Sequence, residues 1–296
     1  MKTFQIYFDK PRVNKEKIAI CLGYFDGVHQ AHKEIIKKAV TNSSLPVALL
    51  TFDKPVSTFL NNNKSKEILT SLNDRFRIIN RLGVDYFYVL HIDESFLNKT
   101  AMEFIEFLKK LNVCEIYVGE DYHFGYKRFG DIALLKNYFK VYSFPLLKID
   151  GSKISTQNIV KLIKDGSIEK ANLLLGQNYL VSGIVTEGLH NGEKLGFKTA
   201  NVKLSDNYII PLFGVYKVIA YIDGIPHLAI ANVGVHPSID IISNPLIEVH
   251  IPGLSENLYN CSISVEFLKF IRPEIKFNNL EELTNQIKKD ITYLSK

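Results

Sequence analysis

Two histidines three residues apart belong to a segment with two glycines, Gly23-Tyr24-Phe25-Asp26-Gly27-Val28-His29-Gln30-Ala31-His32. At a helix start, His29 and His32 can both point at one phosphate chain, and Gly23 and Gly27 would let the backbone approach it closely. A zinc half-site would need a third ligand, and no HExxH sequence or cysteine partner is evident. The chain has neither GxxxxGK[ST] nor GxGxxG, so phosphate binding would have to use another motif.

This segment joins a predicted strand over residues 17–23 to a predicted helix over residues 32–40. An open α/β sheet binds ligands beyond the carboxyl ends of its strands, and a helix N-terminus presents a positive dipole end to anions. In the same turn, Asp26 either orients the loop or contacts nucleotide, with an ordinary Asx-turn as the alternative. Spacing alone leaves nucleotide binding and a satisfied surface pair both open for the histidines.

The first half of the chain alternates strand and helix patterns. Such alternation predicts βαβ units and a parallel sheet. Beyond the two elements already named, we predict strands over residues 1–10, 46–52, 85–91, 113–119 and 141–147, and helices over 71–82, 101–111 and 132–139.

The second half is rich in strands without intervening helices, which predicts a closed antiparallel barrel. Two short helices, 157–164 and 168–175, precede it, and the second ends at Gly176 as a C-cap. We place the domain boundary there, giving domains of residues 1–176 and 177–296. The predicted barrel strands are 179–186, 214–222, 227–233, 246–251 and 261–270, and a helix over 280–294 closes the chain.

Length and composition favour a globular protein of two domains. The chain has 296 residues, 46% of them hydrophobic and 23% charged, and it contains neither a bilayer-length apolar run nor a signal peptide, so we expect a cytoplasmic protein. Cys21, Cys114 and Cys261 lie far apart and are expected to be reduced thiols. The net charge of +5 comes without a dense basic block, so small anionic ligands are expected and nucleic acid is not.

Six motifs in order resemble one family. FDGVHQAH, ending at His32, is similar to the FDGxHxGH signature of HxGH nucleotidyltransferases, in the version of the prokaryotic bifunctional riboflavin kinase/FAD synthetases. The other five are GEDYHFG from Gly119, similar to GxDFxFG; LGFKTAN from Leu195, similar to LGFPTAN; NVGVHPS from Asn232, similar to NIGxRPT; IEVH from Ile247, similar to LEVHL; and RPEIKF from Arg272, similar to RxExKF. The resemblance implies an N-terminal Rossmann-like nucleotidyltransferase domain and a C-terminal β-barrel riboflavin kinase domain.

The resemblance also implies roles for the N-terminal residues. FMN would attack the α-phosphorus of ATP and release pyrophosphate, with His29 and His32 donating hydrogen bonds to the developing charge. Flavin contacts are implied for Asp121 and Phe124. Contacts with ATP are implied for Gly23, Phe25, Asp26, Gly27, Ser155 and Thr156.

For the C-terminal half, the resemblance implies that Thr199 and Asn201 hold Mg²⁺ with the ATP phosphates. Glu248 would be the general base on the 5′-hydroxyl of riboflavin, and an outward-facing strand carboxylate is the alternative reading of that residue. Gly192 and Gly196 would belong to the loop near the nucleotide. Flavin contacts are implied for Asn232, Arg272 and Glu274.

Several positions depart from the family pattern. Ala31 replaces the glycine between the histidines, Lys198 replaces a proline, and the histidine of TFxPHP is missing from the segment Thr51–Val56. In the ISSTRIR segment both arginines are replaced, by Asn158 and Val160, and neither replacement can clamp a phosphate bidentately. Ser155 and Thr156 remain as donors, and Lys127, Arg128 and Lys153 are candidates to compensate.

Three functions are compatible with these observations: an enzyme that makes FMN and then FAD, a riboflavin kinase with a weak or inactive adenylyltransferase domain, and a flavin-binding regulatory protein without turnover. The retained Thr199-Ala200-Asn201 triplet and Glu248 argue against the third. The lost arginines separate the first from the second. The sequence leaves the oligomeric state open between a monomer and a weak oligomer.

Overall fold

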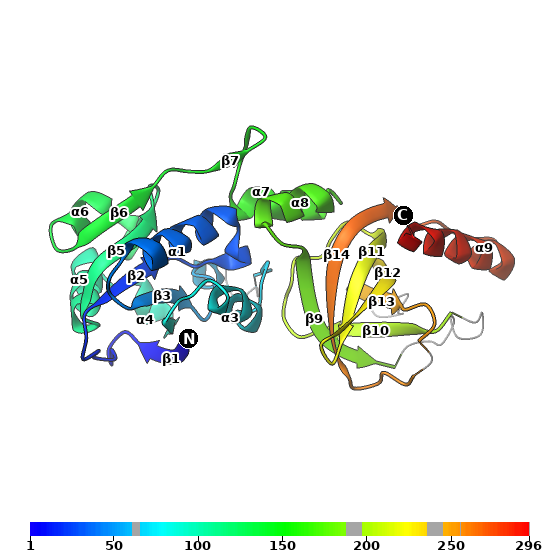
Figure 1. Ribbon diagram of the computed structural model, residues 1–296, viewed down its shortest axis with the longest axis horizontal. Helices are drawn as coiled ribbons and strands as arrows, with labels where there is room; N and C mark the ends of the chain where they lie inside the picture. The colour runs from blue at the N-terminus through cyan, green and yellow to red at the C-terminus, as the bar shows by residue number, and fades with distance from the viewer. Residues whose placement is uncertain (61–65, 188–196, 236–244, 255, 296) are drawn as a thin grey trace. The chain divides into compact units, whose positions relative to one another are not determined.

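A computed structural model describes the chain except for residues 61–65, 188–196, 236–244, 255 and 296 (Figure 1). It divides into two compact units, Met1–Lys66 with Thr70–Thr156, and Glu67–Leu69 with Gln157–Lys296. The helices α7 (Thr156–Lys164) and α8 (Ile168–Leu175) therefore group with the second unit by their contacts. The functional boundary at Gly176 stays a prediction.

The first unit contains a six-stranded sheet in which every pair is parallel, as expected. Its order is β1-β4-β3-β2-β5-β6. The strands are β1 (Lys2–Tyr7), β2 (Ile18–Leu22), β3 (Val47–Phe52), β4 (Tyr86–His91), β5 (Val113–Gly119) and β6 (Lys140–Phe144); a two-stranded hairpin, β7 (Lys148–Ile149) with β8 (Ser152–Lys153), follows.

Helices cover both faces of this sheet (Figure 1). One apolar cluster joins Ile36 of α1 and Ile79 of α3 to Cys21 of β2, and the other joins Phe104 of α5 and Leu135 of α6 to Ile20 of β2. Burial on both faces explains the continuous apolar runs of the central strands. The helices are α1 (Gln30–Asn42), α2 (Ser57–Leu60), α3 (Leu72–Asn80), α4 (Glu94–Leu97), α5 (Ala101–Lys110) and α6 (Ile132–Lys136), with short 3-10 turns η1 (Asp26–Val28) and η2 (Tyr126–Arg128).

The strand order places the topological switch point between β2 and β5. After β2 the chain runs through α1 to β3 on one side, whereas β5 and β6 lie on the other side. Ligands of open α/β sheets bind outside the carboxyl ends of the strands at such a point. The loops that follow β2 and β5 therefore form the expected ligand edge.

The second unit is a closed antiparallel barrel, as predicted, with the order β10-β13-β12-β11-β14-β9. The strand β10 was not predicted, because only Ala200 and Val202 alternate inward over its six residues and so short a pattern is a weak signal. The elements are α7 (Thr156–Lys164), α8 (Ile168–Leu175), β9 (Tyr179–Thr186), β10 (Thr199–Leu204), β11 (Gly214–Ile222), β12 (Ile225–Val235), β13 (Pro245–His250), β14 (Ser262–Arg272), α9 (Leu280–Ile291) and the 3-10 turn η4 (Thr292–Ser295). Within the described residues, no helix has both the length and the apolar character needed to cross a bilayer.

Candidate active site

The loop after β2 has an unusual backbone. Phe25, Gly27 and Val28 have φ values of 55°, 75° and 40°, so the left-handed region is adopted three times in four residues. Only one of these residues is a glycine, and a left-handed conformation strains a side chain as bulky as valine or phenylalanine. Strain of this kind persists only where surrounding contacts hold the loop in place.

Thr70 supplies such contacts from 43 and 44 residues along the chain. Its backbone N–H donates to Asp26 Oδ1 at 2.9 Å, its hydroxyl donates to the same oxygen at 3.2 Å, and that hydroxyl accepts from the Gly27 N–H at 2.9 Å. Asp26 is only 6% exposed. The contacts of Asp26 are thus those of a loop-orienting carboxylate, and its contact with nucleotide stays a prediction.

His29 and His32 lie face to face, with ring centroids 3.6 Å apart and an interplanar angle of 13°. His29 is the N-cap of α1, and its Nδ1 accepts the backbone N–H of His32 at 3.4 Å. Because Nδ1 is an acceptor, the proton of a neutral His29 belongs on Nε2. The structure therefore brings the two predicted catalytic histidines together at the start of the helix.

Both histidines favour the neutral form. Burial lowers the pKa of His29 to about 4, and burial followed by the field of His29 lowers the pKa of His32 well below its usual value. Two stacked imidazolium rings would repel each other in a site with little water. At neutral pH the pair can donate hydrogen bonds to phosphate oxygens as neutral imidazoles, with the N-terminus of α1 adding positive potential.

The lowered pKa of His29 predicts a loss of stability in acid. A folded-state pKa of about 4, against 6.5 for the free side chain, leaves stability intact above pH 6.5 and removes about 3 kcal/mol as pH falls from 6.5 to 4. The free energy of exchange of the β2 and β3 amides, measured by native-state hydrogen exchange across this range, should follow that loss. The variant His29→Asn, which keeps an N-cap side chain, should show a shallower slope; equal slopes would contradict the assignment.

The loop after β5 carries the predicted flavin residues, and they lie in different environments. The side chain of Asp121 is 63% exposed, and its Oδ2 lies 4.0 Å from Lys153 Nζ. Its negative charge acts on His29, where it slightly opposes the lowering of the pKa by burial. Phe124 is 6% exposed and packs against Phe104 with centroids 5.3 Å apart. Asp121 is thus placed at the ligand edge, whereas Phe124 belongs to the core beneath it; flavin contacts by either residue stay predictions.

The segment that lost the family arginines lies at the start of α7. Ser155 precedes the helix, Thr156 begins it, and both are partly exposed. Of the three candidate replacements, Lys153 approaches Asp121, and Lys127 lies over the ring of Tyr126 at 5.2 Å from its centroid. Arg128 is exposed in the same turn as Lys127.

In the barrel, a row of polar residues crosses four neighbouring strands. Glu248 of β13 lies directly opposite Asn201 of β10 and Asn232 of β12, and Thr186 of β9 lies opposite Asn201. Directly opposed residues in an antiparallel pair have Cβ atoms about 4.5–5.5 Å apart, so these side chains can act on one ligand. Their strand neighbours Ala200, Val202, Ile247, Val249, Ala231 and Val233 are all buried inside the barrel, which places the row on its outer face.

Glu248 is thus an outward-facing strand carboxylate, as its alternative reading supposed, yet it lies amid the other predicted kinase residues. Asn201 is only 8% exposed although it faces outward, and Thr199 lies two residues before it on the same face. The sequence did not indicate Thr186, because its membership in the row depends on pairing between β9 and β10. Gly192, Gly196 and residues 236–238 of the NVGVHPS motif lie outside the described residues.

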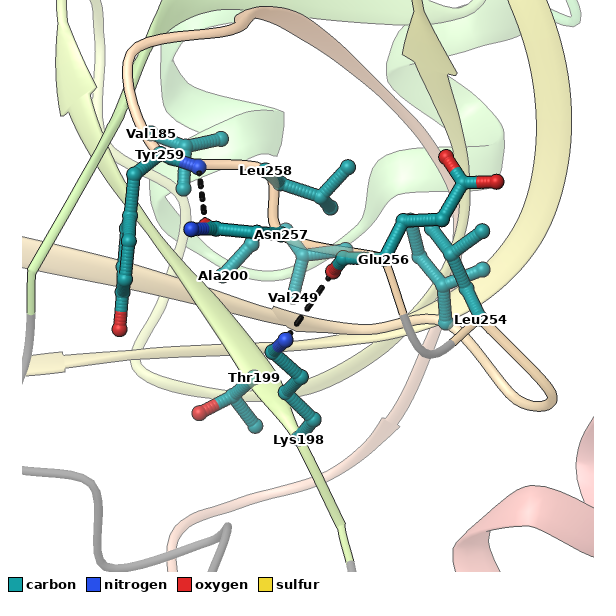
Figure 2. A pocket seen from close by; sticks show the side chains of 11 residues that line it. Val185, Lys198, Thr199, Ala200, Val249, Leu254, Glu256, Asn257, Leu258 and Tyr259 are labelled. Carbon is teal, nitrogen blue, oxygen red and sulfur yellow. Dashed lines mark hydrogen bonds between the residues drawn. The ribbon is translucent and has the colours of Figure 1, made fainter.

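A pocket opens beside Thr199 (Figure 2). Its volume is about 370 Å³ when the space open to solvent is included. Lys198 reaches across it and donates from Nζ to the Glu256 carbonyl oxygen at 3.1 Å, so this lysine, in place of proline, ties β10 to the opposite wall. Most of the lining is apolar: Val185, Ala200, Val249, Ile251, Leu254, Leu258 and the ring of Tyr259.

The donor set here suits a hard cation shared with phosphates. Thr199 and Asn201 offer neutral oxygens, and Glu248 offers a carboxylate across the strand pair from Asn201. In the described part of the chain, no group of three or more His, Cys, Asp or Glu side chains is placed to hold a metal ion. A cation at Thr199 and Asn201 would share its shell with nucleotide oxygens and water, as Mg²⁺ commonly does.

The remaining predicted flavin residues anchor the end of β14. Arg272 donates from Nε to Asp290 Oδ1 at 3.0 Å and from Nη2 to Oδ2 at 2.6 Å, and Asp290 is 3% exposed on α9. The carboxylate of Glu274 packs directly against Gly234. A side chain at position 234 would not fit, because its Cβ would lie 2.2 Å from Glu274 Oε1. The contacts of Arg272 are thus with the closing helix. Asp290 was not predicted, because nothing in the local sequence marks it.

Replacing Asp290 with alanine should destabilise the barrel unit by about 2 kcal/mol, because charge-assisted hydrogen bonds are lost and Arg272 keeps a mostly buried charge. The measurement is exchange of the β11 and β14 amides in the full chain. Glu281→Ala, which removes an exposed carboxylate from the same helix, is the control and should have little effect. Equal effects of the two substitutions would show that the bidentate pair does not stabilise α9.

Each half of the chain matches a known protein family, and full-length relatives combine the two. A family model described as FAD synthetase matches residues 12–161, and one described as riboflavin kinase matches residues 175–296. Relatives named bifunctional riboflavin kinase/FMN adenylyltransferase are 35% identical in Listeria monocytogenes and 34% identical in Bacillus subtilis, each over 98% of this chain and 96% of the relative.

A crystal structure from Streptococcus pneumoniae, titled a macrolide-efflux protein, shares 30% identity with a TM-score of 0.92 over 99% of this chain and 98% of that one. The efflux name belongs to the Streptococcus protein, and only the similarity of fold and sequence bears on this chain. The motifs, the fold of each unit and the full-length relatives agree, and the resemblance seen in the sequence is confirmed: this chain belongs to the bifunctional riboflavin kinase/FMN adenylyltransferase family.

Proposed function

We propose that this chain phosphorylates riboflavin to FMN in its C-terminal unit and adenylylates FMN to FAD in its N-terminal unit, using ATP in both steps. The observation that carries the proposal is the register that sets Glu248 between Asn201 and Asn232. A carboxylate between polar neighbours supports a role as general base toward a hydroxyl of a bound substrate.

In the kinase step, the riboflavin 5′-hydroxyl attacks the γ-phosphorus of ATP and ADP leaves. Glu248 accepts the hydroxyl proton as the new O–P bond forms. Thr199 and Asn201 would hold Mg²⁺, which neutralises charge on the phosphates when it is bound. We assign the apolar pocket beside Thr199 to the adenine base, because its largely apolar lining next to the phosphate residues suits a flat base.

In the adenylyl step, an FMN phosphate oxygen attacks the α-phosphorus of ATP and pyrophosphate leaves. His29 and His32 donate hydrogen bonds to the oxygens that gain charge, and neither has to change protonation state. The N-terminus of α1 adds to the same potential. No covalent intermediate is needed, because the FMN phosphate attacks the α-phosphorus directly.

One observation favours a second candidate, a kinase whose adenylyltransferase domain is weak or inactive. Asn158 and Val160 stand where the family has arginines, and losing one donor to a developing charge costs roughly two to three decades in rate. Lys153, beside Asp121 at the ligand edge, is the candidate replacement with a described contact there.

We propose a cytoplasmic location, where both ATP and flavins are available.

The test is separation of flavins by chromatography after the purified chain is incubated with Mg²⁺-ATP and either riboflavin or FMN. We expect FMN from riboflavin and FAD from FMN. FMN without FAD would establish the kinase alone. Binding of flavin without conversion of either substrate would favour a regulatory protein and overturn the proposal.

A further inference from the structure

Arg75 of α3 is among the most buried side chains of the protein, with 1% of its surface exposed. Its Nη1 donates to the Tyr24 carbonyl at 2.9 Å and to Thr51 Oγ1 at 2.8 Å, and lies 3.4 Å from the Phe52 carbonyl oxygen. The guanidinium carbon lies 4.6 Å from the centroid of the Tyr24 ring. One side chain thus ties the loop after β2 to the end of β3.

The guanidinium of Arg75 forms no direct ion pair within the described residues, although the charges of Asp26 and Asp53 act on the neighbouring Tyr24 side chain. No carboxylate oxygen of the described residues lies within 4.0 Å of this guanidinium, the acceptors described above are neutral oxygens, and Nε is buried without a partner. A buried cation without a direct carboxylate partner is costly, and a neutral donor could serve carbonyl and hydroxyl acceptors at less cost. The retained charge therefore favours an anion that binds nearby.

The contacts of Arg75 lead directly to the proposed phosphate site. Tyr24 follows Gly23 and precedes the left-handed Phe25, and its carbonyl also accepts from Thr51 Oγ1 at 2.7 Å. Both donors hold this peptide group, and Phe25 in turn contacts the His32 ring edge-on with centroids 5.0 Å apart. A charge in the interior is screened less than one at the surface, so anions on this loop feel it strongly.

We propose that Arg75 is a positioning residue for adenylyl transfer that also attracts the ATP triphosphate through its buried charge. It fixes the Tyr24 carbonyl and so the strained loop that carries His29 and His32. The family pattern has arginines at positions 158 and 160, where this chain has Asn158 and Val160. The charge of Arg75 supplies part of the attraction for phosphate that those arginines would give. This inference rests on the proposed adenylyl transfer in the N-terminal unit.

The experiment compares Arg75→Met and Arg75→Lys with Arg77→Met, which removes an arginine of the same helix whose side chain is 65% exposed. For each variant, KM for ATP and kcat are measured for FAD formation and, in the same preparation, for FMN formation. Arg75→Met should raise the KM for ATP in FAD formation by at least tenfold. Arg75→Lys, which keeps the charge, should recover most of that loss, and Arg77→Met should change neither step.

FMN formation is the internal control, because Arg75 lies in the other unit, and it should stay within twofold in all three variants. An unchanged KM for ATP in Arg75→Met would overturn the proposal. An equal loss in Arg75→Lys and Arg75→Met would overturn the role of the charge. If Arg75→Met does not fold, Arg75→Gln, which keeps a hydrogen-bond donor without the charge, takes its place: an unchanged KM for ATP overturns the proposal, and a rise that is absent from Arg75→Lys and Arg77→Met supports it.

A wild-type chain that forms no FAD would refute the adenylyl half of the proposed function without deciding the role of Arg75. In that case the readout is protection of the amides of residues 20–35 from hydrogen exchange when Mg²⁺-ATP is added. Protection in the wild type and Arg77→Met that is lost in Arg75→Met supports the proposal. Equal protection in all three, or no protection in the wild type, overturns it.

Discussion

Replacing Glu248 with glutamine is expected to lower the kcat for FMN formation by a factor of about 10²–10⁴, which is the usual contribution of a general base. Glutamine keeps the shape of the side chain between Asn201 and Asn232 but cannot accept the proton of the riboflavin hydroxyl. FAD formation from supplied FMN should stay within about twofold, because that step takes place in the other unit. Flavin chromatography with each substrate measures both rates.

The matched control is Glu266→Gln. Glu266 is also a partly buried carboxylate on a barrel strand, where it accepts from Asn178 at 3.3 Å, and it lies on β14 away from the polar row. Its substitution should leave FMN formation nearly unchanged. An equal loss of both activities in Glu248→Gln would refute separate sites, and a normal rate of FMN formation would remove Glu248 from the reaction.

Replacing His32 with alanine is expected to lower FAD formation by about 10²–10³, the range found when one donor to a developing oxyanion is removed. His32 suits this test better than His29, because His29 also caps α1 and its loss would disturb the helix. FMN formation in the same preparation should be unaffected. His227→Ala, which removes a histidine from β12, is the control and should leave FAD formation unchanged.

The pH dependence of FAD formation gives a further check on this assignment. Because the pKa of His29 is lowered to about 4 and that of His32 lies well below its usual value, neither ring titrates between pH 6 and 8. The ratio of wild-type to His32→Ala rates should therefore be constant over that range. A ratio that falls as pH rises through 6.5 would mean that the charged imidazolium acts, and loss of FMN formation in His32→Ala would contradict the division of labour.

The alternation of strands and helices could be predicted from the sequence wherever the apolar period is long. The predicted ranges 168–175, 179–186 and 214–222 coincide with α8, β9 and β11. These elements bury a regular stripe of side chains, and that stripe is a local property of the chain. The strand β10 lacked such a stripe although it carries Thr199 and Asn201.

The amino-acid sequence determined the two fold classes, the family and the residue types at each site, because periodicity and motifs are written in neighbouring residues. Only the tertiary structure decided which of those residues act together. The row through Glu248 needs the register of four strands, the hold on Asp26 comes from Thr70, and the buried charge at Tyr24 comes from Arg75. These contacts join residues that are tens of positions apart, and burial and pairing energies of the whole unit, rather than local preference, select them.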